Sequence, residues 1–251
     1  MINLKSSALR TALATAVTAA GLLATANASA AVVYANNFDS AAIVGAGVTA
    51  VGLSNGSLGT ATGSYAGSGG KSWSNNYFYN ASTGNPATMS TLTLSNLGAH
   101  THVSIDMMLG FLNSWDSSNG SPAPDYLDIY IDGNLAYKLT TVTAGGNVND
   151  HGGGTQVVDN GQIDGSQFYS DDLVDMSTAS FLSFAHTSST LTLSFQASGA
   201  GWQGGTDEFW GVDSLSISTR GGGNPVPEPA TWALVMIAGL AAAATRRQGA
   251  R

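Results

Sequence analysis

Hydrophobic and polar residues alternate with a period of two along several stretches of this chain. In HVSIDMMLGFL, residues 102–112, every second residue from Val103 to Phe111 is hydrophobic. Alternation of this kind is typical of a strand with one buried face, because successive side chains point to opposite faces of a sheet. No part of the region shows a helical period, so the pattern predicts an all-β body.

Residues 125–140 predict a β-hairpin. Every second residue from Leu127 to Ile131 is hydrophobic, the sequence Asp132-Gly133-Asn134 follows, and the alternation then resumes as far as Leu139. Asp-Gly is a preferred pair at a tight turn between two strands, because such turns require residues that tolerate a positive φ.

The same alternation occurs in residues 89–97 and 190–195, and clusters of Gly, Ser and Asn separate the predicted strands. Many short strands divided by such turns predict an antiparallel β-sandwich of the jelly-roll type over residues 31–220, with a barrel as the alternative. Residues 143–175 show weak periodicity, and we interpret them as a long loop or an irregular insertion.

The first thirty residues have the three parts of a secretory signal peptide. Lys5 and Arg10 lie near the N-terminus, an apolar stretch follows, and Ala28-Ser29-Ala30 forms a small-residue cleavage site. We therefore expect residues 1–30 to form a signal helix that is cut after Ala30. An uncut membrane anchor is the alternative.

The C-terminal segment combines a hinge, an apolar run and arginines. Residues 221–229 form a Gly/Pro-rich linker, and residues 230–251 form an apolar, transmembrane-like helix with a basic tail. The uncharged stretch from Ala230 to Ala244 would rise about 22 Å as a helix, short of a hydrocarbon core of about 30 Å. This length favours a transient stop in the inner membrane, and Arg246 and Arg247 would fix its orientation.

Composition excludes several classes of function. The chain has no cysteine, and this rules out disulfides, thiolate metal sites and a cysteine nucleophile. Residues 31–225 carry three bases and fifteen acids, a net charge of −12, which excludes a nucleic acid partner. The body also lacks G-x-S-x-G, H-E-x-x-H and phosphate-loop motifs, so we expect a non-enzymatic protein.

The C-terminal order of a Pro-Glu-Pro motif, Trp-Ala, an apolar helix and arginines resembles the PEP-CTERM sorting signal of exopolysaccharide-producing Gram-negative bacteria. The residues that carry the motif are Val226, Pro227, Glu228, Pro229, Trp232 and Ala233. The resemblance implies recognition by the membrane protease exosortase and delivery to the cell surface or extracellular matrix. An ordinary single-span anchor is the alternative interpretation.

The ends of the body resemble a second family. The opening NNFD at residues 36–39 and the closing DEFWGVDSLSIS at residues 207–218 look like the terminal strands of lectin-like or carbohydrate-binding-module jelly rolls. The resemblance implies that the two terminal strands lie together, with a structural calcium ion near them.

Asp213 and Asp39 are the candidate calcium ligands. Asp213 shares its parity with Leu215 and Ile217, so it is predicted to face the core, where a carboxylate requires a partner. With three bases in the body, a cation or a set of backbone donors is the expected partner, and calcium prefers oxygen ligands. The alternatives are a bulge that turns Asp213 toward solvent, or a turn-capping role.

Trp202 and Trp210 are candidate ligand contacts, with core packing as the default interpretation. Together these features predict an exported surface or extracellular-matrix protein with a role in adhesion or in contact with exopolysaccharide. The alternatives are an extracellular carbohydrate-active enzyme and a carbohydrate-binding module anchored permanently in the membrane.

Overall fold

The computed structural model describes residues 30–165 and 169–221 of the chain. These ranges contain no α-helix, and their strands form antiparallel sheets, so the prediction of an all-β, antiparallel, sandwich-like body is confirmed. The helical turns within the same ranges are three short 3₁₀ segments, namely η1 (Ser68–Gly70), η2 (Met176–Thr178) and η3 (Ser180–Leu182).

The larger sheet has nine strands. Its main path runs in the order β12-β13-β9-β16-β1-β2, while β14 pairs with β9, β7 pairs with β16, and β4 pairs with β7. The strands of this sheet are β1 (Ala31–Asn36), β2 (Ile43–Val44), β4 (Ser57–Thr60), β7 (Asn76–Asn80), β9 (His102–Asn113), β12 (Thr155–Gly161), β13 (Asp171–Asp175), β14 (Ser183–Ala185) and β16 (Glu208–Arg220).

The second sheet has five strands in the order β11-β10-β15-β8-β3, and a two-stranded sheet, β5-β6, completes the body. The strands of these sheets are β3 (Thr49–Val51), β5 (Tyr65–Ala66), β6 (Ser72–Trp73), β8 (Ser90–Ser95), β10 (Tyr126–Ile131), β11 (Asn134–Leu139) and β15 (Thr190–Ser198).

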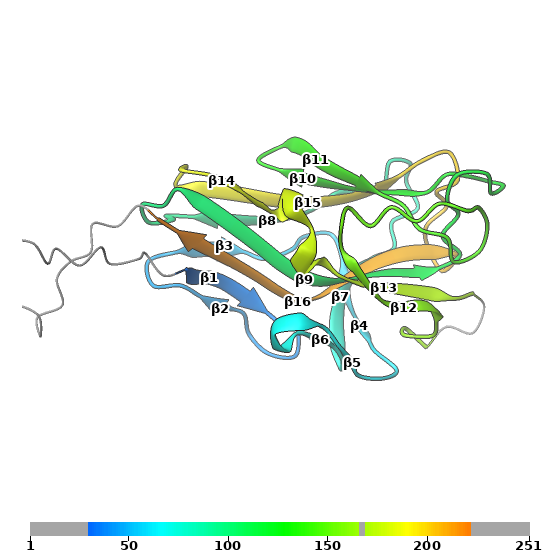
Figure 1. Cartoon of the computed structure of the whole chain (residues 1–251), viewed down its shortest axis with the longest axis horizontal. Helices are drawn as coiled ribbons and strands as arrows, with labels where there is room; N and C mark the ends of the chain where they lie inside the picture. The colour runs from blue at the N-terminus through cyan, green and yellow to red at the C-terminus, as the bar shows by residue number, and fades with distance from the viewer. Residues whose placement is uncertain (1–29, 166–168, 222–251) are drawn as a thin grey trace, which may run out of the picture. The chain divides into compact units, whose positions relative to one another are not determined.

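The five-stranded sheet lies over one face of the nine-stranded sheet (Figure 1), and the main hydrophobic core fills the space between them. Leu92 and Leu193 enter this core from the five-stranded sheet, and Ile105 and Ile217 enter it from the nine-stranded sheet. We call the face of the nine-stranded sheet that points away from the five-stranded sheet the outer face.

The first and last strands of the body lie side by side. β1 pairs with β16 in an antiparallel register that places Asn36 opposite Leu215. The expected contact between the opening and closing segments of the body is therefore confirmed.

The predicted hairpin is confirmed as well. β10 and β11 are joined by Asp132 and Gly133, whose φ angles are 49° and 76°. Two positive φ angles match the right-handed twist of the flanking strands, which explains why the turn contains an Asp-Gly pair.

From Met107 to its end, β9 is buried on both of its faces. The alternating residues from Val103 to Phe111 enter the main core, as the pattern predicted, while Met108 and Leu112 enter a second cluster on the outer face. The sheet is therefore covered on its outer side by other parts of the same chain.

The prediction of a long loop or irregular insertion over residues 143–175 is wrong at two places, because β12 and β13 form the end of the nine-stranded sheet.

β13 has the sequence DDLVD, and all five of its residues are buried. Asp171 accepts backbone N–H groups from Asn113 and Ile163, and Asp172 accepts one from Asn160. These non-local donors let carboxylates take buried strand positions, which hydrophobic alternation cannot reveal.

The predicted signal helix and C-terminal helix fall on residues 1–29 and 222–251, outside the described residues. Across residues 30–165 and 169–221, no helix is long and apolar enough to cross a membrane.

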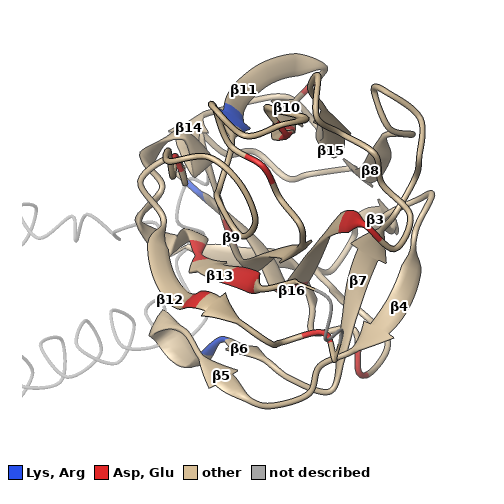
Figure 2. Cartoon of the chain, turned by 90° about the vertical axis from the view of Figure 1, so that its right-hand side faces the viewer, with Lys and Arg blue, Asp and Glu red and all other residues tan. Residues whose placement is uncertain are grey.

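Acidic segments are spread over the strands and loops of the body, with few basic ones among them (Figure 2). Lys71 forms ion pairs with Asp106 and Asp175, with N–O distances of 3.0 and 3.2 Å, and Lys138 pairs with Asp128. Most of the carboxylates must therefore be solvated or satisfied by N–H and O–H donors.

Asp175 ties the η1 turn to the nine-stranded sheet. Its carboxylate accepts the backbone N–H of Ser68 at 2.5 Å and that of Ser177 at 3.0 Å, and it pairs with Lys71. Burial by itself would raise the pKa of Asp175, but these donors outweigh it and lower the pKa to about 2.

We expect Asp175→Asn to lower the free energy of unfolding by about 2 kcal/mol at pH 7, because a pKa shift of one unit corresponds to about 1.4 kcal/mol. A lowered pKa contributes stability above the unfolded value near 4, and this contribution disappears as the pH falls toward 2. Urea unfolding at pH 7 and at pH 2.5 measures both effects.

Asp159→Asn is the control, because Asp159 lies exposed on β12 and should change stability little at either pH. An equal loss for Asp175→Asn at both pH values would show that packing, and not ionisation, accounts for the effect.

Candidate functional site

A row of aromatic rings lies on the outer face of the nine-stranded sheet. Trp73 of β6 stacks on Tyr77 with ring centroids 4.3 Å apart, Tyr77 lies 6.1 Å from Tyr79, and Tyr79 lies 5.4 Å from Phe209. Tyr77 and Tyr79 share one face of β7 because they are two residues apart. The row therefore runs from β6 across β7 to β16.

Two glycines allow this row to lie close to the sheet. A Cβ atom at Gly110 would lie 2.7 Å from the Trp73 ring, and one at Gly211 would lie 2.9 Å from it. Gly110 and Gly211 are directly opposite each other in the pairing of β9 with β16. The indole ring thus packs on bare backbone, and it in turn supports Tyr77.

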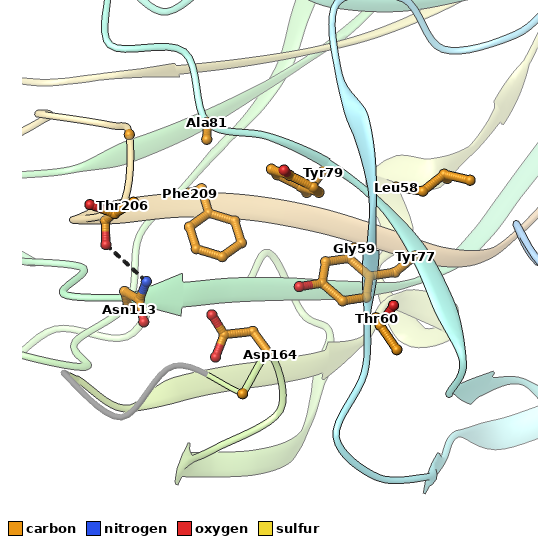
Figure 3. Close-up of a pocket in the computed structure, with 12 residues that line it drawn as sticks. Leu58, Gly59, Thr60, Tyr77, Tyr79, Ala81, Asn113, Asp164, Thr206 and Phe209 are labelled. Carbon is orange, nitrogen blue, oxygen red and sulfur yellow. Dashed lines mark hydrogen bonds between the residues drawn. The ribbon is translucent and has the colours of Figure 1, made fainter.

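The far end of the row opens into a pocket of about 750 Å³. Figure 3 shows the rings of Tyr77, Tyr79 and Phe209 and the carboxylate of Asp164 around the same hollow. The residues that line it are Leu58, Gly59, Thr60, Tyr77, Tyr79, Ala81, Asn113, Asp164, Gly165, Gly205, Thr206 and Phe209. We call this hollow the aromatic pocket.

A buried carboxylate positions the polar side of the aromatic pocket. Asp171 is fully buried and accepts the backbone N–H groups of Asn113, Ile163 and Asp164 at 2.9, 2.6 and 3.2 Å. Burial raises the pKa of Asp171 to about 6, although these hydrogen bonds oppose the shift. Asp171 therefore joins the end of β9 to the loop that carries Asp164.

The side chain of Asn113 is also held in place, because its Nδ2 donates to the carbonyl oxygen of Thr206 at 3.1 Å (Figure 3). Its Oδ1 is buried and has no hydrogen-bond partner within the described protein. A buried acceptor without a donor carries a desolvation cost.

The electrostatic character of the aromatic pocket is neutral to acidic. Burial, followed by the charges of Asp164 and Asp171, raises the pKa of Tyr77, so its hydroxyl stays protonated. Asp164 is the one carboxylate among the described lining residues, which include no lysine or arginine. The pocket thus combines apolar rings with a few polar groups and favours uncharged ligands with hydroxyl groups.

Trp202 and Trp210 do not contribute to this pocket. Trp210 is fully buried in the main core, 5.1 Å from the ring of Phe195. Trp202 is 4% exposed, packs 5.4 Å from Trp115, and donates its Nε1–H to the carbonyl of Ser82. The structure thus shows core packing, the default interpretation, for both rings, and ligand contact by these two residues stays a prediction.

The predicted core-facing position of Asp213 is also wrong. A bulge between Asp213 and Ser216, with Ser214 at a φ of 51°, reverses the alternation of β16. Leu215 enters the main core, whereas the carboxylate of Asp213 binds the backbone N–H of Ser74, next to the outer-face strand β6. An extra residue in one strand turns the following side chains to the other face.

Asp213 nevertheless stays buried, with 1% exposure, so the alternative of a solvent-facing carboxylate is wrong too. It accepts the backbone N–H groups of Ser74 at 3.0 Å and Ser214 at 2.5 Å. Burial raises its pKa to about 7 against these hydrogen bonds.

Asp39 is exposed and accepts the backbone N–H of Asn76 at 2.9 Å, and its charge contributes to the raised pKa of Asp213. In the part of the chain that the structure describes, no three His, Asp or Glu side chains are arranged to hold a metal ion. Calcium binding by Asp39 and Asp213 stays a prediction. The backbone N–H groups of Ser74 and Ser214 already provide hydrogen-bond partners for the buried carboxylate of Asp213.

Sequence reasoning missed the residues that line the aromatic pocket. Tyr77 and Tyr79 share parity in NYFYN, residues 76–80, which is a signal for an aromatic strand face. Phe209 gave no such signal, because its position depends on the pairing of β16 with β7 and β9. Asp164 gave none either, because its loop is held by a hydrogen bond to the buried Asp171.

Residues 225–248 match the family model of the PEP-CTERM protein-sorting motif. The chain carries a PEP-CTERM sorting motif. This match confirms the resemblance of the C-terminal segment, and the PEP-CTERM motif indicates exosortase-dependent sorting of an exported protein. The residues from Val226 to Ala233, together with Arg246 and Arg247, fall within the matched segment, although they lie outside the described residues.

No curated protein matches this chain. Among solved structures, the chain is similar to one titled "Structure of infectious bursal disease virus Gt strain", at 17% identity and a TM-score of 0.27. The similarity covers 76% of this chain and 36% of that chain, and a TM-score of this size supports no conclusion about the body.

We expect Trp202→Phe to lower the free energy of unfolding by about 1 to 3 kcal/mol, because it leaves the Ser82 carbonyl without its donor and reduces buried area. Chemical denaturation followed by circular dichroism measures the loss. Polysaccharide binding should not change. Loss of binding at unchanged stability would instead identify Trp202 as a ligand contact.

Proposed function

We propose that this chain is a non-enzymatic surface or extracellular-matrix protein that binds uncharged polysaccharide through the aromatic pocket. The observation that carries the proposal is the grouping of Tyr77, Tyr79 and Phe209 with Asn113 and Asp164 around one hollow. Sugar rings have apolar C–H faces and hydroxyl edges. Aromatic rings bind the faces, and amide and carboxylate groups bind the hydroxyls.

The preference for an uncharged polymer follows from the charge of the site and of the body. Asp164 lines the aromatic pocket, and fifteen acids against three bases surround it over residues 31–225. A polymer of uronic acids would be repelled, whereas a neutral one would not.

The enzymatic alternative finds less support. A glycosidase requires two carboxyl groups on opposite sides of a bound sugar, and the aromatic pocket presents Asp164 alone among its described lining residues. Burial raises the pKa values of Asp125 and Glu208 to about 7 and 8, but both residues are fully buried and do not line the pocket.

The PEP-CTERM motif supports export and sorting. In our proposal the signal peptide is removed after Ala30, exosortase recognises the segment from Pro227 to Pro229, and the apolar helix contacts the inner membrane only until processing. The body then remains at the cell surface or in the matrix, where polysaccharide is accessible. Permanent anchoring would differ only in the fate of the C-terminal segment.

Mass spectrometry of the protein recovered from the cell surface and medium of the host tests the sorting step. We expect a C-terminus near Pro229, because processing at the motif removes the helix and its arginines. Pro227→Ala should leave the chain in the membrane fraction. An intact Arg251 in the mature wild-type protein would make the segment a permanent anchor.

Affinity electrophoresis in gels that contain the host's neutral exopolysaccharide tests the binding site. We expect Tyr79→Ala to weaken retardation at least tenfold, because it removes the central ring of the aromatic pocket. A tenfold loss corresponds to about 1.4 kcal/mol, a typical effect for one aromatic contact.

Tyr130→Ala is the matched control, since Tyr130 is a partly exposed tyrosine on β10 of the five-stranded sheet and should leave retardation unchanged. Melting temperatures of both variants report on folding. Equal retardation of wild type and Tyr79→Ala would contradict binding at this pocket.

A further inference from the structure

A second hollow lies next to the aromatic pocket and meets it at Tyr79. It has a volume of about 490 Å³, and Tyr79 and Ala81 line both hollows. Its lining residues are Asn55, Gly56, Ser57, Tyr79, Asn80, Ala81, Ser82 and Thr88. We call it the polar hollow, because apart from Tyr79 and two small residues its walls consist of amides and hydroxyls.

The two hollows follow the same pair of strands. β4 contributes Leu58, Gly59 and Thr60 to the aromatic pocket and Ser57 to the polar hollow. Ser57 is directly opposite Tyr79 in the pairing of β4 with β7. A ligand that extends along β4 from the aromatic pocket past Tyr79 therefore reaches the polar hollow.

Internal hydrogen bonds hold the walls of the polar hollow in place. The Ser82 Oγ donates to Thr88 Oγ1 at 3.1 Å and accepts the backbone N–H of Thr88 at 3.0 Å. Asn55 Nδ2 donates to the carbonyl of Met89 at 2.8 Å. Side chains that are already ordered lose less entropy when a ligand binds, so this hollow is preorganised.

We propose that the aromatic pocket and the polar hollow form one groove that binds several consecutive residues of an uncharged polysaccharide chain, with Tyr79 between two neighbouring subsites. This inference rests on the proposed function and names its ligand more closely. Apolar rings at one end and uncharged amides and hydroxyls at the other match a polymer whose every unit has an apolar face and a hydroxyl edge.

The shape of the groove favours a chain over a single sugar. The four residues of β4 span about 13 Å at about 3.3 Å per residue, which is longer than one sugar ring. No charged residue is present among the described residues that line the polar hollow. A charged peptide would therefore find no ionic partner there, whereas the hydroxyl groups of a neutral chain would find donors and acceptors.

The test is the dependence of affinity on chain length. Oligosaccharides of two to eight sugar residues are size-fractionated from a partial hydrolysate of the host's neutral exopolysaccharide and titrated into the full-length protein by calorimetry. We expect affinity to rise at least tenfold over the series and then to level off once both hollows are filled.

Two variants in the polar hollow separate its contribution. Thr88→Val and Ser57→Ala each remove a hydroxyl from an exposed position and should weaken the longest oligosaccharides about fivefold, while the shortest bind as before. Tyr79→Ala should weaken every length, because its ring lines both hollows. Thr93→Val on β8 is the matched control and should change nothing.

The outcomes distinguish this inference from the proposed function. Length-independent affinity that is still lost in Tyr79→Ala would overturn the groove and leave the aromatic pocket as the binding site. Absence of binding by polymer and oligosaccharides alike would overturn both. A doubled molar mass in light scattering that reverts to the monomer in Ser57→Ala would also overturn the groove, because a second copy would then occupy β4.

Discussion

The pairing of β9 with β16 is the interaction on which the rest of the body depends. The two strands pair from Glu208 opposite Asn113 to Arg220 opposite His102, and β16 also pairs with β1 and β7. One face of this central ladder closes the main core against the five-stranded sheet, and the other supports the outer aromatic row. The first half of β9 fixes the register, because a slip by one residue would expose Val103 and Ile105 and bury Ser104 and Asp106.

The bulge in β16 changes which residues of the strand point into the main core. Before the bulge, Trp210 and Val212 enter the main core, and after it Leu215 and Ile217 do so. The bulge leaves Asp213 at the outer face, where its carboxylate accepts the backbone N–H of Ser74, next to β6. The position of β6 in turn places Trp73 against Gly110 and Gly211. Tyr77 stacks on Trp73 and lines the aromatic pocket.

Buried carboxylates hold parts of this body together by accepting backbone N–H groups. With three bases among residues 31–225, buried acids accept backbone N–H groups instead, including distant ones such as Asn113 for Asp171 and Ser74 for Asp213. Several hydrogen bonds to one carboxylate offset part of the cost of its burial, and they also hold irregular loops against the sheet. One of these hydrogen bonds comes from the backbone N–H of Asp164, a residue that lines the aromatic pocket. In a chain that the PEP-CTERM motif marks for export and that has no cysteine to form disulfides, these bonds help to hold its loops without cross-links.

The sequence by itself determined the all-β class, the inward faces of β8, β10 and β15, the Asp132-Gly133 turn and the C-terminal sorting motif, because these depend on period-two alternation, local turn chemistry or a contiguous string of residues. Only the tertiary structure decided the face of Asp213, the strands within residues 143–175, the burial of Trp202 and the union of Tyr79, Phe209 and Asp164 around one hollow. A bulge reverses a face without any change in composition, and a buried carboxylate depends on donors from distant segments. A pocket wall depends on which strands pair, and pairing between distant strands is a property of the whole chain.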